Sequence, residues 1–321
     1  MPDRHRYKPS AETERNMHMN GKIVLLAPHP VGEAMLNTAE SILTEIAVSF
    51  GHSFSITREK IGEYSKRAWG AALTEETVES CENCDVIMAG DSACEGIEAL
   101  AYSLNIPLIV RSASQGTVIA RTTGTDPAIL NSAAREAFAD CERQRLPLAH
   151  VAPSGNASAL AWRSAIKVWS EKYPRISCRE VAAPAAMTWF IRHPEQSGMM
   201  LFPPYAGGIF CGAADALVPS PAMSHERAVG KEHLFFAPVI PFGTNDAEDI
   251  SPLGTVGCVL EILKKLGLNN EVECLETVRD NVINAGWHTR DIPGASPAVD
   301  ASAIVNLMLE QIEMAGSFIK K

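Results

Sequence analysis

Short apolar runs alternate with amphipathic segments along most of this 321-residue chain. Residues 21–27 form a mostly apolar run that ends at a proline, as in a strand buried within a parallel sheet. The apolar residues that follow recur at helical spacing as far as Gly51, which predicts an amphipathic helix. A second strand is predicted at 53–57, a helix opens at 73–77, and residues 85–90 form another buried strand. This alternation of strands and helices predicts an α/β protein with a doubly wound sheet.

The remaining chain repeats both patterns. Further strands are predicted at 107–111 and 199–202. Further helices are predicted at 131–144, 157–172, 255–266, 272–285 and 301–315. Between positions 203 and 241 the chain carries six prolines, which predict a loop-rich stretch.

Composition narrows the possible partners and the compartment. The formal net charge is −10 and no long Lys/Arg run is present, which predicts no nucleic-acid partner. No apolar stretch reaches the ~18–20 residues of a membrane helix, so no membrane partner is expected. Residues 1–20 are polar and predict a disordered tail rather than a signal peptide. The eight scattered cysteines predict reduced thiols and a cytoplasmic location.

Cys81 and Cys84 form the only close cysteine pair. A redox pair of this spacing favours the start of a helix, where the helix dipole stabilises a thiolate. This pair instead ends a helical pattern, and no second pair completes a zinc site. Packing at a helix end is the favoured interpretation.

Several motifs lie in the order and spacing of a known family. They are KIVLL at 22–26, LTEETVESC at 73–81, LIVR at 108–111 and TRDIPG at 289–294. With them the chain resembles the isocitrate and isopropylmalate dehydrogenases, which are β-decarboxylating dehydrogenases, from about residue 22 to 319. The resemblance implies the two-domain isopropylmalate-dehydrogenase-like fold. A large α/β domain would combine 21–96 with 220–321, and a smaller α/β domain at 97–219 would carry the dimer-forming elements.

The reaction of that family uses residues that are absent here. The resemblance implies oxidation of a 2-hydroxy acid by NAD(P), followed by decarboxylation assisted by Mg²⁺ or Mn²⁺. Three aspartates of the family hold the cation, and a tyrosine and a lysine handle protons. The corresponding positions of this chain are Pro184, Gly208, Gly212, Val118 and Ala152.

The cofactor loop of the family is altered as well. Residues 237–245 read APVIPFGTN where the family has EPVHGSAPD, so Ile240 and Pro241 replace the histidine and glycine that approach the adenosine. Ile240, Pro241 and Phe242 are expected to fill that space. No NAD(P) and no Mg²⁺ or Mn²⁺ are therefore expected as cofactors.

These losses make the chain a pseudoenzyme candidate. The first interpretation is a family member without metal- and NAD-dependent oxidative decarboxylation. It would bind a small carboxylate or other anion, serve as a regulatory or structural subunit, or catalyse a different reaction. The alternative is an NAD(P)-dependent dehydrogenase of a 2-hydroxy acid with a relocated active site. The resemblance also implies a homodimer, or a hetero-oligomer with a related subunit.

Four residues are candidate ligand contacts. Arg111 ends a strand at the expected interdomain cleft and either holds an anion or forms a salt bridge. His29 lies in the first strand-to-helix turn and either meets a ligand or caps the loop. Ser154 lies beside the position of the family lysine, and Asn245 ends the altered cofactor loop. A serine-hydrolase turn at Ser92 is the less favoured alternative, because no glycine follows at the required offset.

Overall fold

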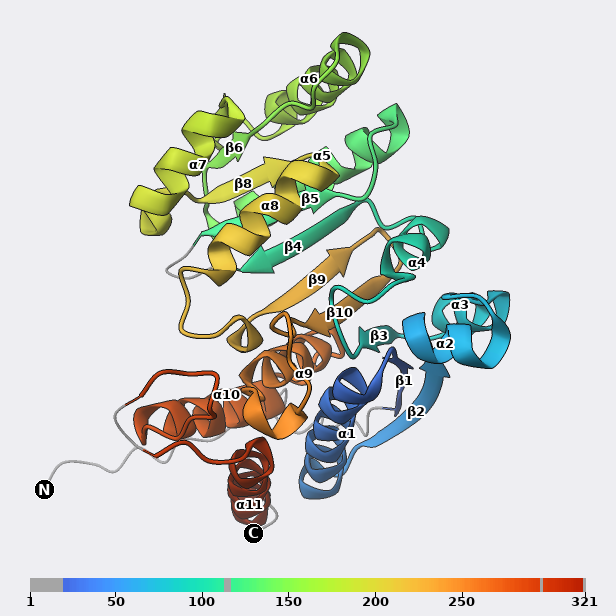
Figure 1. The fold of residues 1–321 in the computed structure, drawn as a ribbon, viewed down its shortest axis with the longest axis vertical. Helices are drawn as coiled ribbons and strands as arrows, with labels where there is room; N and C mark the ends of the chain where they lie inside the picture. Colours follow the sequence, from blue (N-terminus) through green and yellow to red (C-terminus); the bar gives the residue numbers. More distant parts are fainter. Residues whose placement is uncertain (1–19, 113–116, 295–296, 320–321) are drawn as a thin grey trace, which may run out of the picture.

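The computed structural model describes residues 20–112, 117–294 and 297–319. The predicted tail at 1–20 lies outside these residues except for Asn20, which begins the first strand. The described strands form one ten-stranded sheet in the order β2-β1-β3-β10-β9-β4-β5-β8-β6-β7 (Figure 1). The predicted α/β class with a doubly wound sheet is confirmed.

The bounds of the elements are as follows. The strands are β1 Asn20–Ala27, β2 Ser53–Lys60, β3 Val86–Ala89, β4 Leu108–Ser112, β5 Val118–Thr122, β6 Leu148–His150, β7 Cys178–Glu180, β8 Met199–Phe202, β9 His225–Val229 and β10 Leu234–Pro238. The helices are α1 Pro30–Phe50, α2 Gly62–Trp69, α3 Glu75–Glu82, α4 Ile97–Ser103, α5 Pro127–Gln144, α6 Asn156–Lys172, α7 Ala183–Arg192, α8 Pro204–Asp215, α9 Leu253–Lys265, α10 Asn269–Asn284 and α11 Ala301–Ile319. None of these helices is long and apolar enough to cross a membrane.

The sheet consists of two parallel halves joined by an antiparallel centre. Strands β2, β1, β3 and β10 run parallel to one another, and so do β5, β8, β6 and β7. Strands β9 and β4 connect the halves, because each pairs antiparallel with both of its neighbours. The two connecting strands therefore lie between the two parallel halves.

Each half has its own core. Helices α1, α9, α10 and α11 pack together on one half, around apolar side chains of β1 and β3. On the other half, α5 and α6 cover Val118 and Ala120 of β5, while α8 packs near the intervening Ile119. Because alternate residues of a strand face opposite sides, α5 and α8 lie on opposite faces of the sheet. The predicted domain boundaries remain predictions.

The first helix forms as the sequence predicts. It ends at Phe50, and Gly51 takes a left-handed φ of 82° while its N–H bonds to the carbonyl of Ala47. A glycine after the last turn is the usual helix stop, since it adopts this conformation without a Cβ clash. The following strand β2 extends to Lys60, beyond the predicted limit.

The expectation of a loop-rich stretch between 203 and 241 is wrong. This stretch contains α8, β9 and β10. Several of its prolines lie at the ends of elements: Pro203 precedes α8, Pro204 opens it and Pro238 closes β10. Proline lacks an N–H donor, and these end positions are where the missing hydrogen bond matters least.

Candidate ligand-binding cleft

A cleft of ≈ 870 Å³ lies over the antiparallel centre of the sheet. One wall is the exposed face of α8, with Tyr205, Gly208 and Gly212. The opposite wall is the turn from Ser92 into the start of α4, and the floor is formed by charged residues of β4, β5 and β9. The volume lies within the usual range for small-molecule sites.

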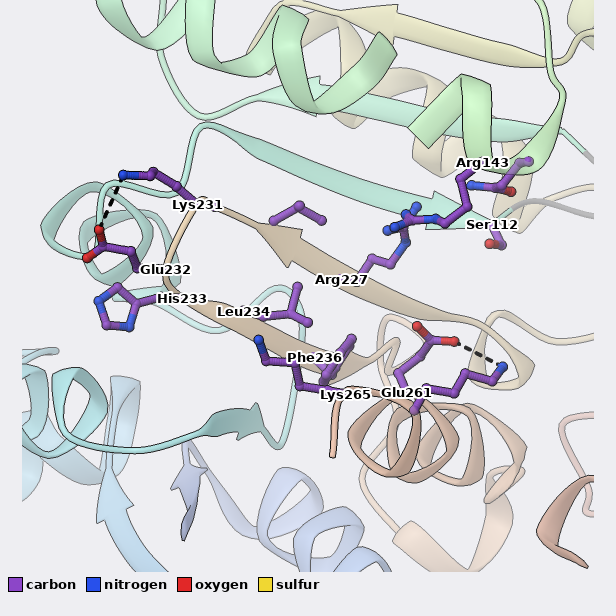
Figure 2. A pocket seen from close by; sticks show the side chains of 14 residues that line it. Ser112, Arg143, Arg227, Lys231, Glu232, His233, Leu234, Phe236, Glu261 and Lys265 are labelled. Carbon is purple, nitrogen blue, oxygen red and sulfur yellow. Dashed lines mark hydrogen bonds and ion pairs between the residues drawn. The ribbon is translucent and has the colours of Figure 1, made fainter. Parts of the chain in front are cut away.

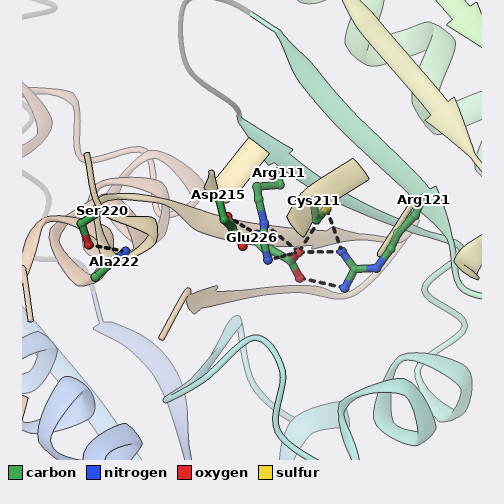
Figure 3. Close-up of polar contacts among 7 residues, drawn as sticks. All are labelled: Arg111, Arg121, Cys211, Asp215, Ser220, Ala222 and Glu226. Carbon is green, nitrogen blue, oxygen red and sulfur yellow. Dashed lines mark hydrogen bonds and ion pairs between the residues drawn. The ribbon is translucent and has the colours of Figure 1, made fainter. Parts of the chain in front are cut away.

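Arg111, Arg121 and Glu226 of this floor form a charge network with Asp215 at the end of α8 (Figure 3). Arg111 donates from Nε to Oε1 of Glu226 at 3.0 Å and from Nη1 to Oδ1 of Asp215 at 2.7 Å. Arg121 donates from Nη1 and Nη2 to the two oxygens of Glu226 at 2.6 and 2.9 Å. Glu226 is thus clamped between two guanidinium groups, and the four formal charges cancel.

Because the network is buried, the charged forms of Glu226 and Arg111 are stabilised by their ion-pair partners. The side chain of Glu226 is only 2% exposed. Burial alone would raise its pKa, but the guanidinium groups of Arg121 and Arg111 outweigh burial and hold the pKa below its usual value. Burial would likewise lower the pKa of Arg111, but Glu226 and other neighbours raise it instead. Glu226 and its two arginines therefore remain charged at neutral pH.

Helix α8 lies directly against this network. A Cβ added to Gly207 would approach Cβ of Arg121 to 2.4 Å, so a glycine is required where the helix crosses the arginine. The face of α8 toward the cleft differs, because a Cβ at Gly208 or Gly212 would meet nothing within 4 Å. Both of these glycines line the cleft.

The other positions carried over from the family lie in different surroundings. Val118 is buried at the start of β5, and Ala152 packs in the loop after β6. Pro184 is exposed in the first turn of α7 and does not line the cleft. None of the three side chains offers an acid, a base or a metal ligand.

The side chains of the cleft do not fit a divalent cation. Magnesium and manganese prefer carboxylate, carbonyl and water oxygens. Of the four carboxylates that line the cleft, Asp215 and Glu226 are bound to arginines and Glu95 to Lys66, which leaves Glu98. Over the described residues, no cluster of three or more His, Cys, Asp or Glu side chains could hold a metal. The expectation of no metal cofactor stays a prediction.

His29 caps a helix and binds a carboxylate. Its Nδ1 accepts from the backbone N–H of Gly32, which places it at the N-cap of α1. Because Nδ1 accepts, the neutral ring carries its proton on Nε2, which lies 3.0 Å from Oδ2 of Asp91. Both ring nitrogens are therefore occupied, and neither can take a proton from the neighbouring Ser92. This geometry disfavours a Ser-His-Asp hydrolase site.

The remaining candidates lie away from the cleft lining. Ser154 and Asn245 are exposed residues of the loops before α6 and before α9, and neither lines the cleft. Ile240 packs against a small apolar cluster that includes Val31. Phe242 is fully exposed, so it does not pack into the fold as Ile240 does. A role for His29, Arg111, Ser154 or Asn245 in ligand binding stays a prediction.

The cysteines near the site are poor nucleophiles. Burial raises the pKa of Cys211, whose Sγ lies 3.8 Å from Nη1 of Arg121. Burial also raises the pKa of Cys94, which lines the opposite wall. In the close pair, Cys84 donates to the carbonyl oxygen of Cys81, and burial raises its pKa to about 11. These thiols are protonated at neutral pH, and the close pair packs at the end of α3.

Most of this network was not predicted from the sequence. Arg111 was predicted to lie at the cleft, but Arg121, Asp215 and Glu226 were not. The alternation of residues in β9 could have indicated that Glu226 is buried, because Glu226 shares its face of the strand with the buried Ala228. A carboxylate on the buried face of a strand requires a cationic partner, and Arg111 was available.

The chain is similar in sequence to known dehydrogenases. No family model matches the chain. The 3-isopropylmalate dehydrogenase of Chlorobaculum tepidum is 20% identical over 342 residues, covering 88% of this chain and 96% of that protein. That of Oceanobacillus iheyensis is 22% identical over 357 residues, covering 92% and 96%.

Solved structures of dehydrogenases share the fold of this chain. Isocitrate dehydrogenase from Methylococcus capsulatus superimposes with a TM-score of 0.78 at 15% identity, covering 91% of this chain and 99% of that chain. A β-decarboxylating dehydrogenase from Thermococcus kodakarensis gives a TM-score of 0.75 at 14% identity, covering 94% and 98%. The fold is that of the β-decarboxylating dehydrogenases. Over most of its length the chain is similar in sequence, at low identity, to isopropylmalate dehydrogenases, and it shares the fold of isocitrate dehydrogenases, as its motifs predicted.

Proposed function

We propose that this family member has lost metal- and NAD-dependent oxidative decarboxylation and uses its cleft to bind a small anion, as a ligand-binding or regulatory protein. The observation that carries this proposal is the charge network of Arg111, Arg121, Asp215 and Glu226 beside two glycines at the carried-over metal positions. The same chain positions that would supply metal ligands to a dehydrogenase supply none here.

The substitutions remove both the metal ligands and the proton-transfer groups of the family reaction. A cation that polarises the substrate hydroxyl needs oxygen ligands, and Gly208, Gly212 and Pro184 have no side-chain oxygen. Proton transfer needs a side chain that can titrate, and Val118 and Ala152 cannot. A water molecule could replace one missing ligand, but not five missing groups. The residues therefore support a change of function rather than a change of substrate.

Anion binding is favoured because one edge of the arginine network is accessible. The side chain of Asp215 is 27% exposed and holds Arg111 from the cleft side, whereas Glu226 lies beneath both arginines. A small carboxylate could displace Asp215 and accept from Nη1 of Arg111 without disturbing Glu226. Charge-assisted hydrogen bonds of this kind are strong and directional.

A homodimer is part of the proposal. Apolar side chains are exposed on α7 outside the cleft, namely Trp189 and Ile191. Exposed apolar patches of this kind mark interaction sites. Sedimentation at micromolar concentration should show twice the chain mass of 34.6 kDa, and Ile191→Asp should shift the protein toward the monomer. A monomer at that concentration, before any substitution, would contradict the dimer.

A turnover assay tests the proposed loss of chemistry. The protein is incubated with NAD or NADP, Mg²⁺ or Mn²⁺, and malate, isocitrate, isopropylmalate or tartrate. The isopropylmalate dehydrogenase of Chlorobaculum tepidum serves as the positive control. No absorbance change at the nicotinamide band is expected for this chain. Substrate-dependent formation of reduced cofactor would overturn the proposal and favour a relocated dehydrogenase site.

A further inference from the structure

A second groove lies on the opposite face of the sheet from the cleft. It has a volume of ≈ 510 Å³ and is floored by Leu234 and Phe236 of β10 together with β9. The C-terminal turns of α5 and α9 form its two sides, and the turn between β9 and β10 closes one end. We call it the rear groove. The neighbours Glu226 and Arg227 of β9 show the separation, since Glu226 lines the cleft and Arg227 lines the rear groove.

Cationic side chains converge on the rear groove from four different elements. They are Arg143 of α5, Arg227 of β9, Lys231 of the closing turn, and Lys264 and Lys265 of α9. Figure 2 shows Arg143 and Arg227 on one side of the groove and Lys265 on the other. Among the described residues, two carboxylates, Glu232 and Glu261, line the same groove. This local excess of positive charge stands against a net charge of −10 for the whole chain.

These cations are only partly neutralised by the protein. Asp140, buried behind the groove, binds Arg143 and Arg227 together. Lys231 makes one long ion pair, of 3.7 Å with Glu232, and Lys264 makes two, of 3.4 Å each with Glu261 and Glu276. Ion pairs of exposed side chains such as these are weak. Lys265 has no ion-pair partner among the described residues. The groove therefore retains unsatisfied donors.

The helix dipole explains only some of the cationic side chains around the rear groove. Lysines in the last turn of α9 complement the negative end of the helix dipole and would occur there without any ligand. That effect does not account for Arg227 on a strand or Lys231 in a turn. Neither does it account for a concave surface of ligand size between them.

We infer that the rear groove binds a compact polyanion carrying two or more phosphate groups. Phosphate oxygens accept from arginine in pairs and from lysine at a single point, which suits this mixture of side chains. Two linked phosphates carry enough charge to meet Arg143 on one side and Lys265 on the other. The bound molecule ties α5 to α9, and hence one half of the sheet to the other. This site does not depend on the function proposed for the cleft.

Calorimetry with inorganic pyrophosphate at low ionic strength tests the site. Saturable one-to-one binding is expected at sub-millimolar concentration, weakening as salt is added because exposed charges are screened. Lys265→Ala and Arg143→Ala should each weaken the affinity by roughly ten-fold, since each removes a charge-assisted hydrogen bond. Lys167→Ala, which removes an exposed lysine of α6 outside the groove, is the matched control and should leave the affinity unchanged.

Titrations with other ligands define the class of ligand that the groove binds. Tighter binding of ADP than of pyrophosphate would identify a nucleotide, and equal binding would show that the phosphates alone are recognised. Citrate bound as tightly as pyrophosphate would overturn the phosphate assignment. The site itself is overturned if pyrophosphate shows no saturable binding, or if Lys265→Ala and Arg143→Ala bind it as the wild type does. Thermal unfolding of each variant without ligand verifies that it is folded.

Discussion

Arg111 and Glu226 are direct partners across the antiparallel strands β4 and β9, and the Nε of the arginine donates to Oε1 of the glutamate at 3.0 Å. The pair lies where the two halves of the sheet meet, at the floor of the cleft. Arg121 of β5 completes the clamp on Glu226. The three side chains thus join β4, β9 and β5 through buried charges.

Removing the central carboxylate should destabilise the fold strongly. Glu226→Gln leaves Arg111 and Arg121 buried without their shared anion, and breaking a buried pair on one side costs about 3–5 kcal/mol. Urea unfolding measures the loss. Glu180→Gln removes the exposed pair with Arg163 and serves as the control, with a much smaller expected change. Equal losses in the two variants would contradict the role assigned to the network.

The same carboxylate should make stability depend on acid. Arg121 and Arg111 outweigh burial and hold the folded-state pKa of Glu226 below its ordinary value of 4.5. The stabilisation is therefore complete above about pH 4.5 and is lost as the pH falls through the lower folded-state pKa. The unfolding free energy of the wild type should fall more steeply below pH 4.5 than that of Glu226→Gln. Parallel curves would refute this assignment.

Two adjacent glycines of α8 should respond in opposite directions to alanine. Gly207→Ala forces a Cβ against Arg121 and should cost about 1–3 kcal/mol, as overpacking does. Gly208→Ala meets open space in a helix and should stabilise the protein by about 0.5–1 kcal/mol. Denaturant unfolding of both variants checks the contrast. A destabilised Gly208→Ala would show that the cleft face of α8 is not free.

Divalent cations should not stabilise the wild type. Stabilisation requires preferential binding to the folded state, and the cleft lacks a fitting set of ligands. Millimolar Mg²⁺ or Mn²⁺ should leave the melting temperature unchanged. The double variant Gly208→Asp, Gly212→Asp places two carboxylates on the cleft face and should respond more than the wild type. A rise of several degrees in the unaltered protein would indicate a relocated metal site.

The sequence predicted the fold well where the pattern was periodic and local. Helix α1 shows this, since its apolar spacing and the stop at Gly51 both depend on neighbouring residues. The sequence failed between 203 and 241, where prolines at the ends of elements were interpreted as signs of loops. Helix α8 was hidden because its apolar and small residues carry little amphipathic pattern.

The site was predictable only in part, because its contacts join residues far apart in the chain. Family spacing located Gly208, Gly212 and Arg111 at one cleft, and the structure places all three there. Spacing could not show that Glu226, 115 positions after Arg111, occupies its guanidinium group. That pairing depends on the register of β4 against β9, which no local motif specifies.

Calorimetric titration with NAD and NADP tests the central claim most directly. The cofactor loop has Ile240 and Pro241 in place of the family's histidine and glycine, and each lost hydrogen bond to a desolvated group costs ~1–3 kcal/mol. Two or three such losses should weaken binding by about 100-fold or more. We predict no saturable binding of either cofactor below millimolar concentration. Micromolar affinity for NAD or NADP would contradict the account and restore a dehydrogenase function.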